Sequence, residues 1–362
     1  MPKKEVKYRF YLFGILATIL LIILIVSLKK EKKEIVPPEV PESNKLFEGL
    51  QEANRLYYSG KFIDAAEKYK AIADKYPDNY PAQIGLGNSY IKLGIHDEAI
   101  KAFNKTLSFK YHDFRTFYGL GLANYNKEGY MEAYGYLKKA YGLNPNDKYT
   151  AIYYVNTLNV LGMYDEAIRL STMELDKKSG QDYYYRKIAF AYLLKNDFQN
   201  AALNAEKSIE LSQKSPNNHL SLAVAKLNLG ETEKALAEFN NALSFQKSNF
   251  IYEGLAFTYY IRNDVQNYEK FKKLANYYIK DSFGLSLLGF AMLQNGKHDK
   301  AIELFNEAIA DNPGYYLPYL GLAKAYMSLG QNERAVENLE KAVKLNDFDV
   351  QSKELLHKLK NG

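Results

Sequence analysis

The sequence predicts an all-α protein in which an array of helix pairs follows one transmembrane helix. Three observations lead to this prediction. The chain of 362 residues repeats itself with a period of 34, the apolar side chains in each repeat recur at helical spacing, and residues 10–28 form an uncharged apolar run. Because a repeat array grows by stacking, this length does not require two or three separate cores.

Composition excludes several classes of protein. The 48 Lys and Arg exceed the 42 Asp and Glu by only six, and most of this excess lies in residues 1–45. The remaining chain is nearly neutral, so we expect no nucleic-acid partner. The chain has no Cys, which excludes a disulfide framework, a thiolate zinc site and a cysteine nucleophile.

The N-terminal region has the pattern of a membrane anchor, with a basic tail at 1–9, a transmembrane helix at 10–28 and a charged, proline-rich linker at 29–45. As a helix, the apolar run would be about 28 Å long, close to the roughly 30 Å of a bilayer's hydrocarbon core. Lys29 and Lys30 follow it without a small-residue cleavage site, so we expect the segment to be retained. Basic residues flank it equally, but a short tail with four positive charges is hard to export. This favours a single-pass protein of the inner membrane with a cytoplasmic N-terminus and the array outside.

When the repeats are aligned with one another, three positions keep the same kind of residue in most repeats, and these three columns of the alignment predict the helix pairs. Small residues mark close helix contacts, alanines form a second column, and glycine or asparagine marks the turns. The array covers 46–349, and a capping helix with a short tail covers 350–362. Together these segments predict nineteen helices. The nine units are 46–79, 80–113, 114–147, 148–181, 182–215, 216–249, the short and degenerate 250–281, 282–315 and 316–349.

The strings HDEAIKAF, YDEAIRL and NERAVENLEKAVKLN resemble the second helix of the tetratricopeptide repeat family. The resemblance implies a right-handed superhelical solenoid whose first helices line a concave groove for a protein or peptide partner. Carried over residue by residue, it places mainly amide and phenol groups in that groove, with Asn88 and Asn156 on an exposed face. The residues are Asn54, Tyr57, Asn88, Tyr118, Tyr125, Tyr149, Asn156, Tyr183 and Arg186. The alternative is that the tyrosines pack between repeats and the asparagines are ordinary surface residues.

The family's clamp for acidic C-termini needs a lysine one helical turn before such an asparagine. At the three asparagines of the predicted groove, the corresponding residues are Leu50, Ile84 and Ile152. The sequence therefore gives no support for an acidic C-terminal tail as the ligand.

Local strings that imitate active sites have structural explanations. The Gly-Leu-Gly strings at 85–87 and 119–121 lie inside predicted helices without a preceding strand, and the acidic pairs at 97–98 and 165–166 suit the first turns of helices. The five histidines have no metal-ligand spacing. We therefore expect no catalytic residue, no cofactor and no metal.

The leading hypothesis is a non-enzymatic, membrane-anchored interaction scaffold outside a bacterial cytoplasmic membrane, acting in envelope assembly, chaperoning or export. The bacterial source is inferred from the anchor and from the richness in Lys, Asn and Ile. Two alternatives remain: a cytoplasm-facing adaptor or regulator of a membrane enzyme or secretion machine, and a polysaccharide-binding export component.

Overall fold

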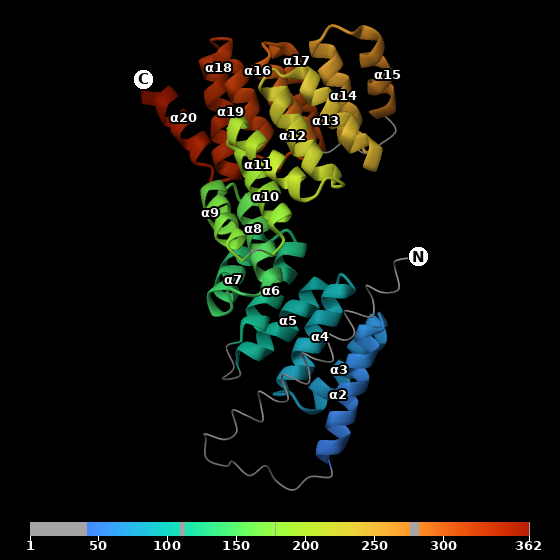
Figure 1. Cartoon of the computed structure of the whole chain (residues 1–362). Helices are drawn as coiled ribbons and strands as arrows, with labels where there is room; N and C mark the ends of the chain where they lie inside the picture. The colour runs from blue at the N-terminus through green and yellow to red at the C-terminus, as the bar shows by residue number, and fades with distance from the viewer. Residues whose placement is uncertain (1–41, 109–112, 178, 276–281, 362) are drawn as a thin grey trace. The chain divides into compact units, whose positions relative to one another are not determined.

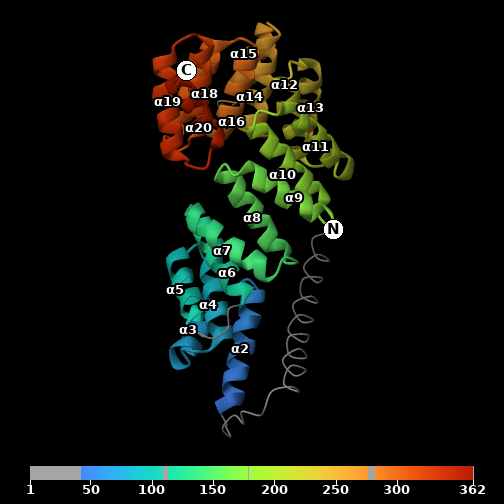
Figure 2. The same cartoon turned by 90° about the vertical axis from the view of Figure 1, so that its left-hand side faces the viewer.

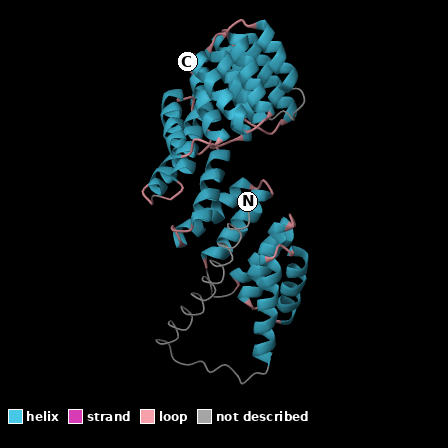
Figure 3. Cartoon of the chain, turned by 45° about the vertical axis from the view of Figure 1, so that its right-hand side comes forward, coloured by secondary structure: helices cyan, strands magenta, loops and turns pink. Residues whose placement is uncertain are grey.

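The computed structural model describes residues 42–108, 113–177, 179–275 and 282–361 (Figure 1). Within these ranges the chain forms nineteen α-helices and no strand (Figure 3). The predicted helix number and the all-α class are thereby confirmed. The predicted transmembrane helix at 10–28 lies outside the described residues, and none of the described helices has the length and apolar character needed to span a bilayer.

The chain divides into two compact units, Met1–Leu143 and Asn144–Gly362. In the first unit each described helix packs on the next, and the first helices of neighbouring pairs also contact each other. The described helices of this unit are α2 (Glu42–Tyr58), α3 (Phe62–Lys75), α4 (Tyr80–Lys92), α5 (His96–Leu107), α6 (Phe114–Asn126) and α7 (Tyr130–Leu143).

The described part of the second unit has six helix pairs and a last single helix, α20 (Figure 2). As predicted for a cap, α20 packs Leu355, Leu356 and Leu359 against the core and leaves Lys353 and Lys358 exposed. The helices are α8 (Lys148–Val160), α9 (Tyr164–Leu175), α10 (Gln181–Leu194), α11 (Phe198–Leu211), α12 (Pro216–Asn228), α13 (Thr232–Phe245), α14 (Asn249–Ile261), α15 (Val265–Ala275), α16 (Ser282–Gln294), α17 (His298–Asp311), α18 (Leu317–Ser328), α19 (Asn332–Leu345) and α20 (Val350–Asn361).

The turn between the two helices of a pair contains one residue with positive φ. Glycine occupies this position in most pairs, and Asn196 and Asn263 occupy it in two, as the sequence indicates. In the third pair the positive φ of 64° belongs to Glu128, whereas the sequence points to the neighbouring Gly129. The turn therefore keeps its geometry even where the side chain disfavours it.

Side chains of second helices pack directly on glycines of first helices, which explains the column of small residues. A Cβ atom added at Gly87 would lie 2.6 Å from the ring of Phe103, and one added at Gly289 would lie 2.5 Å from the ring of Phe305. The same two rings also contact glycines of the next first helix, where an added Cβ would lie 2.5 Å from Phe103 at Gly119 and 2.2 Å from Phe305 at Gly321. A larger residue at any of these glycines would hold the two packed helices apart.

The second unit closes on itself more than a simple stack of repeats would. One hydrophobic core runs through it from Tyr164 to α19, and the leucines of α20 pack against that core. The hydroxyl groups of Tyr164 and Tyr316 are hydrogen-bonded although 152 positions separate them. In addition, Asn196 Nδ2 donates to Gln351 Oε1 over 3.3 Å. The ninth pair and the cap therefore fold back onto the fourth and fifth pairs.

Candidate functional site

The predicted groove residues fall into two groups, because five lie in the first unit and four in the second. In the first unit, Asn54 is half-buried on α2 and its Oδ1 accepts a hydrogen bond of 2.6 Å from the hydroxyl of Tyr69. The ring of Tyr57 packs edge-on against Tyr58 and Phe62, at 5.5 Å between centroids in each case. Burial, together with the neighbouring Tyr58, raises the pKa of Tyr57 to about 12. Both side chains thus contribute to packing within the repeats.

The other predicted residues of the first unit are also half-buried. Asn88 lies on α4, and Tyr118 and Tyr125 lie on α6, which packs against α4. The Tyr125 ring contacts Tyr130 edge-on at 5.4 Å. These residues are on first helices, as expected, but Asn88 is less exposed than a residue on a free surface would be. Their role in partner binding stays a prediction.

In the second unit, Asn156 and Tyr183 join α8 to α10. The Tyr183 hydroxyl donates to Asn156 Oδ1 over 3.0 Å, so Asn156 is half-buried rather than on the exposed face that the sequence suggests. Tyr149 is 54% exposed. Arg186 lies one turn after Tyr183 on α10, and its guanidinium group is 5.2 Å from the centre of the Tyr183 ring. Of these four residues, Arg186 also lines a cavity.

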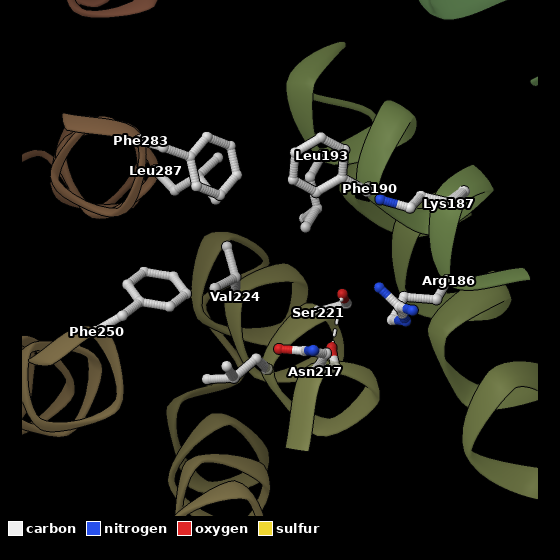
Figure 4. A pocket seen from close by; sticks show the side chains of 11 residues that line it. Arg186, Lys187, Phe190, Leu193, Asn217, Ser221, Val224, Phe250, Phe283 and Leu287 are labelled. Atoms are coloured by element: carbon white, nitrogen blue, oxygen red, sulfur yellow. Dashed lines mark hydrogen bonds between the residues drawn. The ribbon is translucent and has the colours of Figure 1, made fainter. Parts of the chain in front are cut away.

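This cavity, of about 230 Å³, is built entirely from first helices of the second unit: α10, α12, α14 and α16 (Figure 4). Phe190 and Phe283 form part of its apolar wall, with ring centroids 5.0 Å apart. Arg186 and Lys187 enter from α10 with their nitrogen atoms directed inward (Figure 4). The full lining is Arg186, Lys187, Phe190, Leu193, Asn217, Leu220, Ser221, Val224, Phe250, Phe283 and Leu287.

The two cations in this cavity are poorly solvated and are not neutralised by an ion pair. Burial, together with the positive charge of Arg186, lowers the pKa of Lys187 to about 8. Burial also lowers the pKa of Arg186, against the opposing effects of Tyr183 and Asp182. Among the described residues, neither cation has an ion pair or a hydrogen bond to a side-chain acceptor. The Lys187 ammonium instead lies 5.4 Å from the ring centre of Tyr183 and 5.7 Å from that of Phe190.

Two stretches of the chain on either side of the cavity helices match a known repeat. Models of the tetratricopeptide repeat match residues 50–113 and residues 292–359, near the two ends of the array. The chain belongs to the tetratricopeptide repeat (TPR) family.

Two curated relatives are similar over most of the TPR array. The TPR repeat-containing protein MJ1428 of Methanocaldococcus jannaschii is 26% identical over 320 residues, which cover 81% of this chain and 55% of that protein. The Protein CTR9 homolog of Arabidopsis thaliana is 24% identical over 304 residues, covering 82% of this chain and 25% of that protein. The chain therefore spans about half, or less, of the length of these relatives.

Two solved structures are also similar to this TPR chain. The Cut9–Hcn1 hetero-tetramer of the APC/C has a TM-score of 0.44 at 17% identity, covering 86% of this chain and 55% of that one. YrrB, described as a TPR protein with an unusual peptide-binding site, has a TM-score of 0.44 at 24% identity, covering 49% of this chain and 92% of that one.

The sequence identifies Arg186 but not the rest of the cavity, although a signal is present. Arg186 occupies the repeat position where Leu50, Ile84 and Ile152 stand in earlier TPR units, so it is a cation in a mostly apolar column. Lys187 occupies the position of the ring-contacting glycines, such as Gly119. Both departures fall on consecutive residues of one first helix.

TPR proteins are generally non-enzymatic scaffolds, and nothing in the described part of this chain indicates catalysis. No group of three or more potential metal-ligating side chains occurs among the described residues. The buried His219 is engaged within the fold, because its Nε2 is 2.8 Å from the Gln213 carbonyl and its Nδ1 is 2.6 Å from Glu238. The expectation of no metal and no cofactor stays a prediction.

Lys187→Met should stabilise the second unit at neutral pH and reduce the pH dependence of its stability. Folding lowers the lysine pKa from about 10.4 to about 8. Between these two values the unfolded state binds more protons, so stability rises with pH. Lys324, which burial also holds at a pKa of about 8, would supply the slope that remains. Urea unfolding at about pH 7.5 and about pH 9.5 tests this, with the exposed Lys207→Met as the control. Equal slopes in wild type and Lys187→Met would contradict it.

Proposed function

We propose that the chain is a non-enzymatic interaction scaffold that binds a segment of a partner protein in the cavity between α10, α12, α14 and α16. The observation that carries this proposal is the cavity itself, in which apolar side chains face two cations without an ion-pair partner among the described residues. Burial of unpaired charge is unfavourable, so this arrangement is better explained by binding than by stability. The family supports a scaffold as well, and the groove of first helices is the site that the sequence resemblance implies.

Selection of displayed random peptides on the full-length chain tests this proposal. We expect enriched peptides that bind the wild-type chain and lose at least about tenfold in affinity with Phe250→Ala, which removes part of the apolar wall. Phe245→Ala is the matched control, because Phe245 lies on the second helix α13 and does not line the cavity. Thermal midpoints of both variants separate loss of binding from loss of fold. The proposal fails if no peptide is enriched, or if both variants bind equally well.

The polysaccharide alternative leads to a different result in the same variants. A glycan array probed with the wild-type chain and with Phe250→Ala would favour it if an oligosaccharide bound and the displayed peptides did not. The two unpaired cations support a charged peptide over a neutral sugar chain.

For the location of the scaffold, we propose an uncleaved anchor at 10–28 with the TPR array outside the inner membrane, in a role in envelope assembly, chaperoning or export. The apolar run and the four basic residues before it support this topology. Because the chain has no Cys, a single cysteine introduced as Ser43→Cys can be labelled selectively. A membrane-impermeant maleimide should reach it in intact cells. Labelling only after lysis would favour the cytoplasm-facing adaptor or regulator.

A further inference from the structure

Lys187 differs from the other buried lysines in the described part of the second unit in having no acceptor. Lys226, whose side chain is 13% exposed, pairs with Glu206 at 3.1 Å. Lys300, 11% exposed, pairs with Glu303. Lys324 donates to Gln351 Oε1 over 3.0 Å. Each of these three lysines thus has an acceptor within the unit, whereas Lys187 faces the cavity without an acceptor.

Charged groups and a helix N-terminus near Lys187 favour a negative charge at the same end of the cavity. Arg186 adds a second cation, and Asn217 lies in the first turn of α12, where the helix dipole is positive. Ser221 does not add to this preference, because its hydroxyl donates to the Asn217 carbonyl oxygen over 3.0 Å, as the dashed line in Figure 4 shows, and has no second proton for an anion. Among the described residues, the acidic side chain that acts on Arg186 is Asp182, which does not line the cavity.

The opposite end of the cavity is apolar. It is lined by Phe250 on α14, by Val224 on α12 and by Phe283 on α16, whose ring contacts that of Phe190 (Figure 4). The volume of about 230 Å³ is below the roughly 300 Å³ at which pockets for whole small molecules begin. It suits one large side chain and one carboxylate that belong to a longer chain outside the cavity.

We propose that the occupant is a protein segment in which an Asp or Glu is next to a large apolar residue. This inference rests on the proposed function and names the chemistry of the partner. The carboxylate lies between the Arg186 guanidinium and the Lys187 ammonium, with the Asn217 amide as a further donor. The apolar side chain lies against Phe250 and Phe283. The carboxylate then neutralises two cations that the fold leaves unpaired.

A double-mutant cycle on a selected peptide tests this pairing. The probes are one peptide enriched on the full-length chain and its amide analogue, in which Asn or Gln replaces the acidic residue. The protein variants are wild type and Arg186→Gln/Lys187→Met. We expect the amide analogue, or the protein variant with the acidic peptide, to weaken binding at least about tenfold, and the two changes together to add little more. Lys207→Gln, at an exposed cation on α11, should change nothing.

The results separate the two levels of the proposal. If selection enriches no peptide, the proposed scaffold function fails. If peptides bind but carry no acidic residue, or if the amide analogue binds wild type within about twofold of the acid, the scaffold stands and this inference is overturned. The same holds if the loss caused by the amide analogue is unchanged in Arg186→Gln/Lys187→Met. Because removing two unpaired buried charges should not destabilise the fold, a folded protein variant is expected for the cycle.

Discussion

Gly321→Ala should lower the stability of the second unit by about 2 to 3 kcal/mol, although it adds only one methyl group. The new Cβ would lie 2.2 Å from Cε1 of Phe305, whose ring is fully buried between Gly321 on α18 and Gly289 on α16. The ring cannot move away from one glycine without approaching the other. In an open helical position the same substitution usually stabilises, by about 0.5 to 1 kcal/mol.

The matched control is Gly135→Ala on α7, where an added Cβ has no neighbour within 4 Å. Urea unfolding followed by far-UV circular dichroism should show opposite shifts for the two variants. Hydrogen exchange of α18 assigns the effect to the second unit, since the two units need not unfold together. Adding Phe305→Leu to Gly321→Ala should cost less than the sum of the separate changes, because the shorter side chain leaves room for the methyl group. Shifts in the same direction for both glycines would contradict the tight packing.

The features of the fold that the sequence predicts best are those repeated in every unit. The helices, the turns and the contacts between rings and glycines are each formed by residues about one repeat apart or less. Every repeat therefore shows the same pattern again in its own sequence. Glu128 shows the limit of such a prediction. The repeated glycine indicates that a turn is present, but the residue with positive φ is set by its position between the two helices and here is not the glycine. The turn keeps its place even where glycine has moved one residue along.

The closure of the second unit cannot be read from the repeat columns. Tyr164 occupies an ordinary aromatic position of the fourth repeat, and its hydrogen bond to Tyr316 connects that repeat to the ninth. A repeat of 34 residues predicts contacts between neighbouring repeats, but it does not predict a contact between two distant ones. An indirect signal is present in α14 and α16, whose sequences are apolar on nearly all sides. Such helices are buried all round rather than on one face, and α16 indeed contacts both α12 and α18 in addition to its own partner α17.

The candidate site is only partly predictable for a similar reason. Family geometry identifies the first helices as its walls, and Arg186 is found in this way. The cavity itself depends on side chains that vary from repeat to repeat, such as Lys187 at a position that is glycine in only some repeats. The residues that distinguish this site from the other first helices are therefore those that the repeat pattern does not specify.

Gly162→Ala tests the closure directly and should have the second large effect. Gly162 has a φ of +75°, so alanine would be strained there by about 1 to 2 kcal/mol, as at any turn glycine of the array. Only at Gly162, among the described turn glycines with positive φ between paired helices, does an added Cβ also meet another part of the chain, 2.5 Å from Asn346 Nδ2. Asn346 is buried, and its Oδ1 accepts a hydrogen bond from the Phe348 backbone N–H over 3.0 Å. Moving it would break that bond, at a further cost of about 1 to 2 kcal/mol.

Gly230→Ala is the matched control, because Gly230 lies in the same unit with a φ of +77° and an added Cβ would have no neighbour within 4 Å. We expect urea midpoints to place Gly162→Ala below Gly230→Ala, which itself falls below wild type. In an Asn346→Ala background the difference between the two glycine variants should shrink, because the group that the methyl meets is gone. Since backbone strain is the same at both turns, it cannot produce such a difference. Equal losses for Gly162→Ala and Gly230→Ala would therefore mean that the ninth helix pair does not rest against the turn between α8 and α9 in solution.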